Sequence, residues 1–200
     1  LQRRADEVLA GVRPATNAWF WGEGRRPEMP LFRDLYGLSG AVVGAVDLVR
    51  GIGRLAGLDV IDVPGATGDL DTDYAAKGRA AIAALEHHDL VWVHVEAPDE
   101  ASHMGDAGEK IRAIERIDAE VLAPILAVSP RPSVMALPDH HTPVALRTHT
   151  AQPVPFVIGE PLPGSGGGGA MSFGEGEAAA TGLVVADGAA LMRLFLEATG

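Results

Sequence analysis

Carboxylate and imidazole side chains gather in two short segments of this 200-residue sequence. The first segment carries Asp99 and, four residues later, His103. The second carries Asp139 next to His140, with His149 shortly beyond. Imidazole and carboxylate ligands together suit zinc, manganese or iron(II), and magnesium somewhat less well. Because five ligands exceed the three protein ligands typical of one catalytic zinc, the set favours a two-metal site.

An arginine pair, Arg25 and Arg26, could form forked hydrogen bonds to a phosphate or carboxylate near these metals. Taken alone, the pair is better interpreted as a solvated basic turn. Any single aspartate or histidine of the metal set is equally well interpreted as a helix cap or a surface residue. His94, inside an apolar run, is interpreted as a hydrogen-bonded core histidine, and His141 ranks below His140 because adjacent residues seldom face one ion.

Strand and helix patterns alternate along the chain and would position these groups. Apolar runs predict strands, and apolar residues that recur at helical spacing predict helices. Strands are predicted at 15–21, 41–46, 58–63, 90–95, 133–137 and 155–158, and helices at 1–11, 49–55, 72–85, 106–125 and 187–197. The connection lengths allow right-handed crossovers, so the pattern predicts a layered α/β fold.

The arginine pair and both metal segments each follow a predicted strand. In open α/β sheets, functional groups gather just past the carboxyl ends of the strands. If the strands are parallel, the three segments lie at one edge of the sheet. The run at 90–95 is apolar at nearly every residue, which predicts a strand buried on both faces.

Composition excludes several classes of protein. Hydrophobic residues make up 47% and charged residues 22% of the chain, as in soluble globular proteins. The net charge of −11 makes nucleic acid an unsuitable partner, because such a surface must be basic. No apolar window approaches a membrane span. The absence of cysteine excludes disulfides, thiolate metal sites and a cysteine nucleophile.

The motifs resemble those of the cofactor-independent phosphoglycerate mutases of the archaeal type, which belong to the alkaline phosphatase superfamily. The resemblance extends over essentially the whole chain. It implies a three-layer α/β sandwich with a mostly parallel sheet. The matching stretches are WFWGEGRRP at 19–27, AVDLVRGIGRLAG at 45–57, VPGATGDLDTDYAAK at 63–77, HVEAPDEASHMGD at 94–106 and DHHTP at 139–143.

The resemblance also implies roles for the candidate residues. Two divalent ions (manganese, zinc or magnesium) would serve a phosphoryl shuttle through a metal-activated serine, which converts 3-phosphoglycerate to 2-phosphoglycerate in the cytoplasm. Arg25 and Arg26 would grip the small phosphorylated substrate. Asp99, His103 and His149 would hold one ion, and Asp139 and His140 part of the other.

The sequence also departs from this family. Its members are about twice as long, and their nucleophilic serine lies near the N-terminus, before an inserted domain. The serines of this chain match no such position, although Ser102 lies among the ligands. The chain begins as if inside a helix, so residues 1–200 are expected to be the C-terminal portion of the metal-binding phosphatase-like catalytic domain, which would pair with the missing N-terminal half or self-associate.

Two other functions remain open at this stage. One is a related metal-dependent phosphotransferase or phosphatase, such as a homoserine kinase. The other is a catalytically inert metal-binding fragment. In the family that the sequence resembles, an aspartate ligand of the second metal also lies near the N-terminus. This chain would lack that aspartate as well as the nucleophilic serine, so the isolated chain is expected to be inactive.

Overall fold

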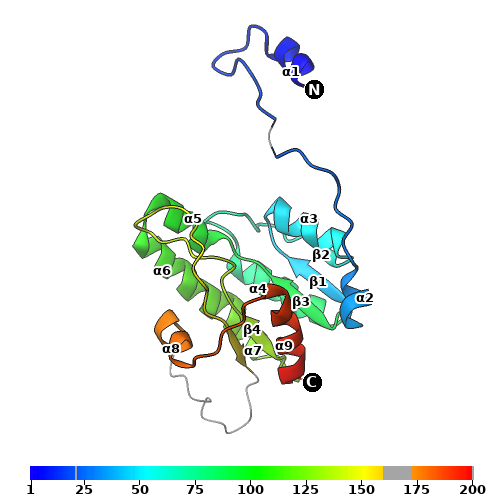
Figure 1. Ribbon diagram of the computed structural model, residues 1–200, viewed down its shortest axis with the longest axis vertical. Helices are drawn as coiled ribbons and strands as arrows, with labels where there is room; N and C mark the ends of the chain where they lie inside the picture. The colour runs from blue at the N-terminus through cyan, green and yellow to red at the C-terminus, as the bar shows by residue number, and fades with distance from the viewer. Residues whose placement is uncertain (21, 160–172, 200) are drawn as a thin grey trace. The chain divides into compact units, whose positions relative to one another are not determined.

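The computed structural model of the protein describes residues 1–20, 22–159 and 173–199 (Figure 1). The chain divides into two units, Leu1–Pro30 and Leu31–Gly200, which are described separately. The first unit holds the predicted N-terminal helix, α1 (Gln2–Leu9). The Gln2 side chain donates hydrogen bonds to Asn17 Oδ1 at 2.7 Å and to Ala18 O at 2.6 Å.

The strand predicted at 15–21 is wrong over its described part. Residues 15–20 have no regular structure, and Trp19 is 85% exposed. A strand needs a neighbour to satisfy its backbone groups, and no described strand pairs with this run. The last residue of the predicted strand, like the glycine-rich stretch at 164–169, lies outside the described residues.

A parallel three-stranded sheet organises the second unit, as the sequence predicts. The strands are β1 (Gly40–Val43), β2 (Asp59–Ile61) and β3 (Leu90–Val93), in the order β2-β1-β3. In the register, Val42 lies between Val60 and Trp92. All of β1 is buried, because strands flank it on both sides and a helix packs on each of its two faces.

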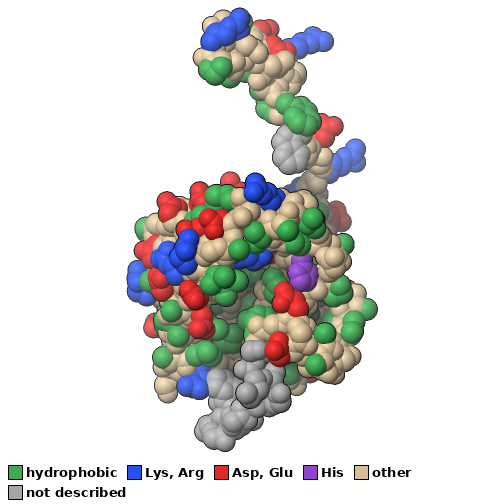
Figure 2. Space-filling view, turned by 90° about the vertical axis from the view of Figure 1, so that its left-hand side faces the viewer, with side chains coloured by type: hydrophobic (Ala, Val, Ile, Leu, Met, Phe, Trp, Pro, Cys, Tyr) green, Lys and Arg blue, Asp and Glu red, His purple; other side chains and the backbone are tan. Residues whose placement is uncertain are grey.

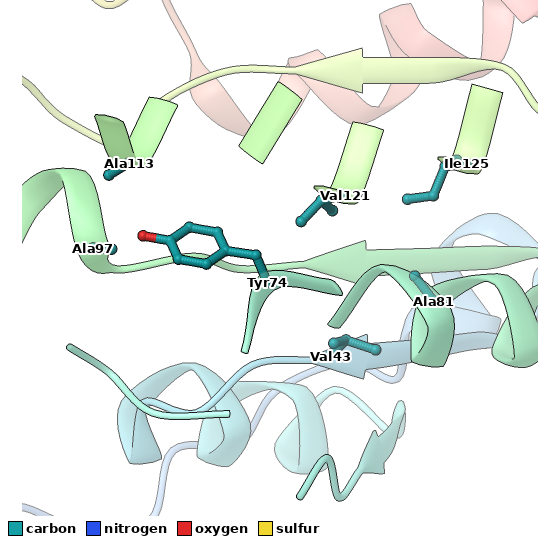
Figure 3. Packing of buried hydrophobic residues seen from close by; sticks show 7 residues of the cluster. All are labelled: Val43, Tyr74, Ala81, Ala97, Ala113, Val121 and Ile125. Atoms are coloured by element: carbon teal, nitrogen blue, oxygen red, sulfur yellow. The ribbon is translucent and has the colours of Figure 1, made fainter. Parts of the chain in front are cut away.

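Helices α3 (Asp47–Leu55) and α4 (Tyr74–Leu85) form the two crossovers and cover opposite faces of the sheet (Figure 1). Gly53 of α3 lies against Val42, whereas Val43, whose side chain alternates to the other face, belongs to the core cluster with α4 (Figure 3). Because α3 packs on β1 and β2, Trp92 of β3 stays 46% exposed. The prediction of a strand buried on both faces is therefore wrong for β3.

The helical run that follows β3 packs on α4 through its last two segments, and it carries much of the core. It consists of α5 (Ala97–Met104), α6 (Ala107–Arg116), the π-helical segment η1 (Ile117–Leu122) and α7 (Ala123–Leu126). Asp106 caps α6 by accepting a hydrogen bond from Glu109 N at 2.9 Å. Ile111 and Ile114 are exposed, whereas Ala113 and Val121 enter the cluster (Figure 3).

The last two strands form a separate antiparallel pair. They are β4 (Val134–Ala136) and β5 (Val157–Gly159). The inference that the segment after 133–137 leaves the same parallel sheet is therefore wrong. The remaining elements are α2 (Phe32–Tyr36), α8 (Glu175–Ala180), η2 (Gly188–Ala190) and α9 (Leu191–Thr199).

No described helix is both long enough and apolar enough to cross a membrane. On the face of the second unit drawn in Figure 2, acidic and basic side chains stand among hydrophobic ones.

Gly78 allows α4 to pack closely on η1, and its replacement provides a test of this packing. A Cβ atom at Gly78 would lie 2.6 Å from the Glu120 carbonyl oxygen, which belongs to the backbone and cannot rotate away. We expect Gly78→Ala to lower the free energy of unfolding by about 1–3 kcal/mol. The control is Gly51→Ala in α3, where a Cβ meets nothing within 4 Å. This variant should gain up to about 1 kcal/mol from helix propensity.

Urea denaturation measures both variants. If Gly78→Ala were as stable as the unmodified protein, the close packing of the two helices would be refuted.

Candidate metal centre

Helix α5 positions the first pair of candidate ligands. It begins directly beyond the carboxyl end of β3, and residues four apart on a helix share a face. The Nε2 atom of His103 accordingly lies 3.2 Å from Asp99 Oδ2. The helix ends at Gly105, whose φ of 75° is the left-handed conformation that glycine adopts easily.

The third candidate ligand, His149, comes from the loop that follows β4. A backbone bridge joins His141 to Thr150, and Thr150 N donates to His141 O at 3.0 Å. This bridge returns the chain so that His149 Nε2 lies 3.0 Å from His103 Nε2 and 3.4 Å from Asp99 Oδ1. One ligand atom from each of Asp99, His103 and His149 lies within 4.8 Å of the other two.

The hydrogen bonds around His103 fix which ring nitrogen faces this cluster. Its Nδ1 atom lies 3.0 Å from the Arg147 carbonyl oxygen, which can only accept a hydrogen bond. Nδ1 therefore carries the proton in the neutral ring, and Nε2 presents a lone pair to Asp99 and His149. A lone pair that faces a carboxylate and a second imidazole is an arrangement that a cation stabilises. The donor set fits a divalent metal ion.

Asp139 and His140 lie beside this cluster. The His140 ring is stacked near that of His149, with ring centroids 3.8 Å apart. His140 Nε2 lies 3.3 Å from Asp139 Oδ2. The structure thus brings Asp99, His103, Asp139, His140 and His149 to one place, although β4 belongs to a different sheet from β3. His141 turns away, with Nε2 2.8 Å from the Pro153 carbonyl oxygen.

Two further acidic residues were not selected from the sequence. Ligand atoms of Glu96, Asp99 and Glu100 also lie within 4.8 Å of one another. Burial raises the pKa of Glu96; protonated His94 would lower it, whereas the carboxylates of Asp99 and Asp139 raise it further. Glu96 directly precedes α5, just beyond the carboxyl end of β3. This position past a strand end is the sequence signal that could have selected it as a candidate site residue.

A buried lysine adjoins the same end of the sheet. Lys77 is 1% exposed, and its Nζ donates to the carbonyls of Thr67 at 3.2 Å and His94 at 3.4 Å. Burial lowers the pKa of Lys77, and the Glu96 carboxylate opposes this shift. Sequence reasoning missed Lys77 because it lies within an alanine-rich helical pattern. The signal was a lysine three residues after Tyr74, on the face that α4 buries.

His94 departs from its prediction as a hydrogen-bonded core histidine. Its Nδ1 atom is buried with no hydrogen-bond partner, and its Nε2 atom lies 3.3 Å from Glu96 Oε2. Arg25 and Arg26 are exposed residues of the N-terminal unit. The role of the arginine pair in substrate binding stays a prediction from the sequence.

Comparisons with known proteins agree on a metal-binding family. Residues 6–197 match the family model described as "Metalloenzyme superfamily". A protein of Geobacter sulfurreducens, named a probable 2,3-bisphosphoglycerate-independent phosphoglycerate mutase, is 49% identical over an alignment of 201 positions that covers 98% of this chain and 49% of that protein. A 2,3-bisphosphoglycerate-independent phosphoglycerate mutase 2 of Methanothermobacter thermautotrophicus is 58% identical over an alignment of 150 positions that covers 74% of this chain and 37% of that protein.

Two solved structures are similar to this chain in fold. The PH0037 protein from Pyrococcus horikoshii is similar with a TM-score of 0.70 and 30% identity, over 88% of this chain and 57% of that one. A cofactor-independent phosphoglycerate mutase from Thermoplasma acidophilum is similar with a TM-score of 0.66 and 25% identity, over 87% of this chain and 40% of that one. The chain spans about half the length, or less, of the curated relatives it matches.

Proposed function

Since the chain belongs to the Metalloenzyme superfamily, we propose that it forms the metal-binding part of a phosphoglycerate mutase that interconverts 3-phosphoglycerate and 2-phosphoglycerate. The observation that carries the proposal is the convergence of Asp99, His103 and His149 around a position suited to a cation. The names of the relatives supply the reaction.

In this proposal Asp99, His103 and His149 hold one divalent ion, and Asp139 and His140 provide part of the site for a second. The ions are manganese, zinc or magnesium. When bound, they would neutralise the charge of the transferred phosphoryl group and lower the pKa of a nucleophilic hydroxyl. The Arg147 carbonyl oxygen orients the ring of His103. Lys77 adds a buried positive charge beside Glu96. Arg25 and Arg26 bind the carboxylate or phosphate of the substrate.

The proposal extends to the organisation of the enzyme. Residues 1–200 would form the C-terminal portion of a phosphatase-like catalytic domain, and a longer chain would supply the nucleophilic serine and an inserted domain. The length of the relatives supports this organisation. Ser102, the serine nearest the ligands, is fully buried and donates its hydroxyl proton to the Pro98 carbonyl at 2.7 Å, so it is unsuited to attack a phosphate. As a glycolytic enzyme, the protein would act in the cytoplasm.

An enolase-coupled assay of the full-length protein that contains this chain tests the function. We expect turnover of 3-phosphoglycerate when manganese, zinc or magnesium is supplied, and none after treatment with a chelator. ATP with homoserine, and p-nitrophenyl phosphate, serve as competing substrates in parallel reactions. Turnover of either competing substrate, without mutase turnover under any of the three metals, would contradict the proposal.

A further inference from the structure

Thr142 lies between the two groups of candidate ligands and contacts one member of each. Its Oγ1 atom is 2.5 Å from Asp99 Oδ1 and 3.2 Å from His140 Nδ1. We propose that Thr142 is a positioning residue that orients both ligands and thereby couples the two ion sites. This inference rests on the metal centre of the proposed function.

The direction of each hydrogen bond follows from what the atoms can do. An ionised carboxylate only accepts, so the hydroxyl proton of Thr142 is donated to Asp99. The same hydroxyl oxygen then accepts, and His140 Nδ1 must carry the proton that it receives. The Nε2 atom of the neutral His140 ring is left with a lone pair, at 3.3 Å from Asp139 Oδ2. Thr142 thus selects Nε2 as the metal-binding nitrogen of His140.

Thr142 is itself held in place. The residue is 5% exposed, and its carbonyl oxygen accepts a hydrogen bond from Lys110 Nζ at 3.0 Å. Lys110 belongs to α6, the helix that follows the ligand helix α5. The hydroxyl group is therefore presented to Asp99 and His140 from a fixed backbone position.

Removal of the hydroxyl would act on both ligands together. The carboxylate of Asp99 could then rotate about its terminal torsion, which has broad preferences. His140 could take the other tautomer, in which Nε2 carries the proton and cannot bind a metal. Loss of an outer-shell partner of metal ligands typically lowers metal affinity by about 10- to 100-fold. We expect a loss of this size for each ion that the protein binds.

The test compares Thr142→Val, which removes the hydroxyl at nearly constant shape, with Thr142→Ser, which keeps it. Thr150→Val is the matched control, because the Thr150 hydroxyl is buried in the same loop without a hydrogen-bond partner. Chelator-competition titrations with zinc and manganese measure the affinities in the full-length protein. We expect about a 10- to 100-fold loss for Thr142→Val, and values within threefold of the unmodified protein for Thr142→Ser and Thr150→Val.

Equal affinities for Thr142→Val and the unmodified protein would overturn the inference, as would a Thr142→Ser variant as weak as Thr142→Val. A second measurement needs no variant. Nitrogen NMR of the metal-free protein reports the tautomer of His140, which we expect to be protonated at Nδ1, and protonation at Nε2 alone would refute the inference. Metal affinity that depends on Thr142 in a protein without mutase turnover would refute the function but support this inference.

Discussion

Asp99→Asn is expected to lower metal affinity by more than about 100-fold and to abolish turnover of the full-length enzyme. The expected loss is larger than the loss of about 10- to 100-fold that is typical when a residue that only orients a ligand is removed, because Asp99 would itself bind the ion. Both carboxylate oxygens of Asp99 are used, since Oδ2 faces His103 at 3.2 Å and Oδ1 faces His149 at 3.4 Å. Asparagine has nearly the same shape but replaces one oxygen with an NH₂ group and removes the charge. One of the two histidines would then face a hydrogen-bond donor in place of a shared anion.

Asp187→Asn serves as the control for this substitution, because it makes the same change of charge at a helix cap. Asp187 accepts a hydrogen bond from Ala189 N at 3.0 Å, and asparagine caps helices as well as aspartate does. Metal titration and the enolase-coupled assay are run on both variants. Turnover of Asp99→Asn within threefold of the unmodified enzyme, at saturating metal, would show that Asp99 is not a ligand.

The 200-residue chain alone is expected to show no phosphoglycerate mutase turnover, even with manganese or zinc added. Phosphoryl transfer needs a hydroxyl beside the metals, in line with the phosphorus. The Ser102 hydroxyl is buried against Pro98 O, and the Thr142 hydroxyl proton is committed to Asp99. Asp139 and His140 alone also leave the second ion short of ligands. The first ion, with three ligands in the chain, should still bind.

The assay compares the isolated chain with the full-length enzyme at equal concentration, against a blank of buffer and metal. Turnover from the isolated chain above that blank would place a nucleophile within residues 1–200. The same measurement on Ser102→Ala would then decide whether Ser102 is that nucleophile.

The candidate ligands could be selected from the sequence because their signal is chemical and local. Asp99 and His103 are one helical turn apart, and the Asp139–His140 pair directly follows an apolar run. The stated reason for their convergence was partly wrong, since β4 pairs antiparallel with β5 and not with β3. The loop after β4 reaches the ligands of α5 through the bridge between His141 and Thr150, which is a non-local contact without a sequence signature.

Other errors arose where burial depends on neighbours that a sequence does not reveal. The run at 15–20 is apolar enough for a strand but has no strand beside it among the described residues. Ile111 and Ile114 follow the helical period, yet the buried face of α6 is centred on Ala113. Lys77 is charged and fully buried, which average residue preferences disfavour. Its cost is offset by the carbonyls of Thr67 and His94, which come from other elements.

The bridge between His141 and Thr150 closes the loop of residues 142–149 before any ion binds. In a flexible chain, binding of the two ions would have to bring His140 and His149 together against the conformational entropy of the loop between them. Here the ends of the loop are already joined by backbone hydrogen bonding, so ion binding has to order only the side chains of the ligands. Longer insertions at this loop would cost little in closure entropy, about 0.6 kcal/mol for each doubling of length. They would instead weaken metal binding by displacing Thr142 and the Arg147 carbonyl, which orient the rings of His140 and His103.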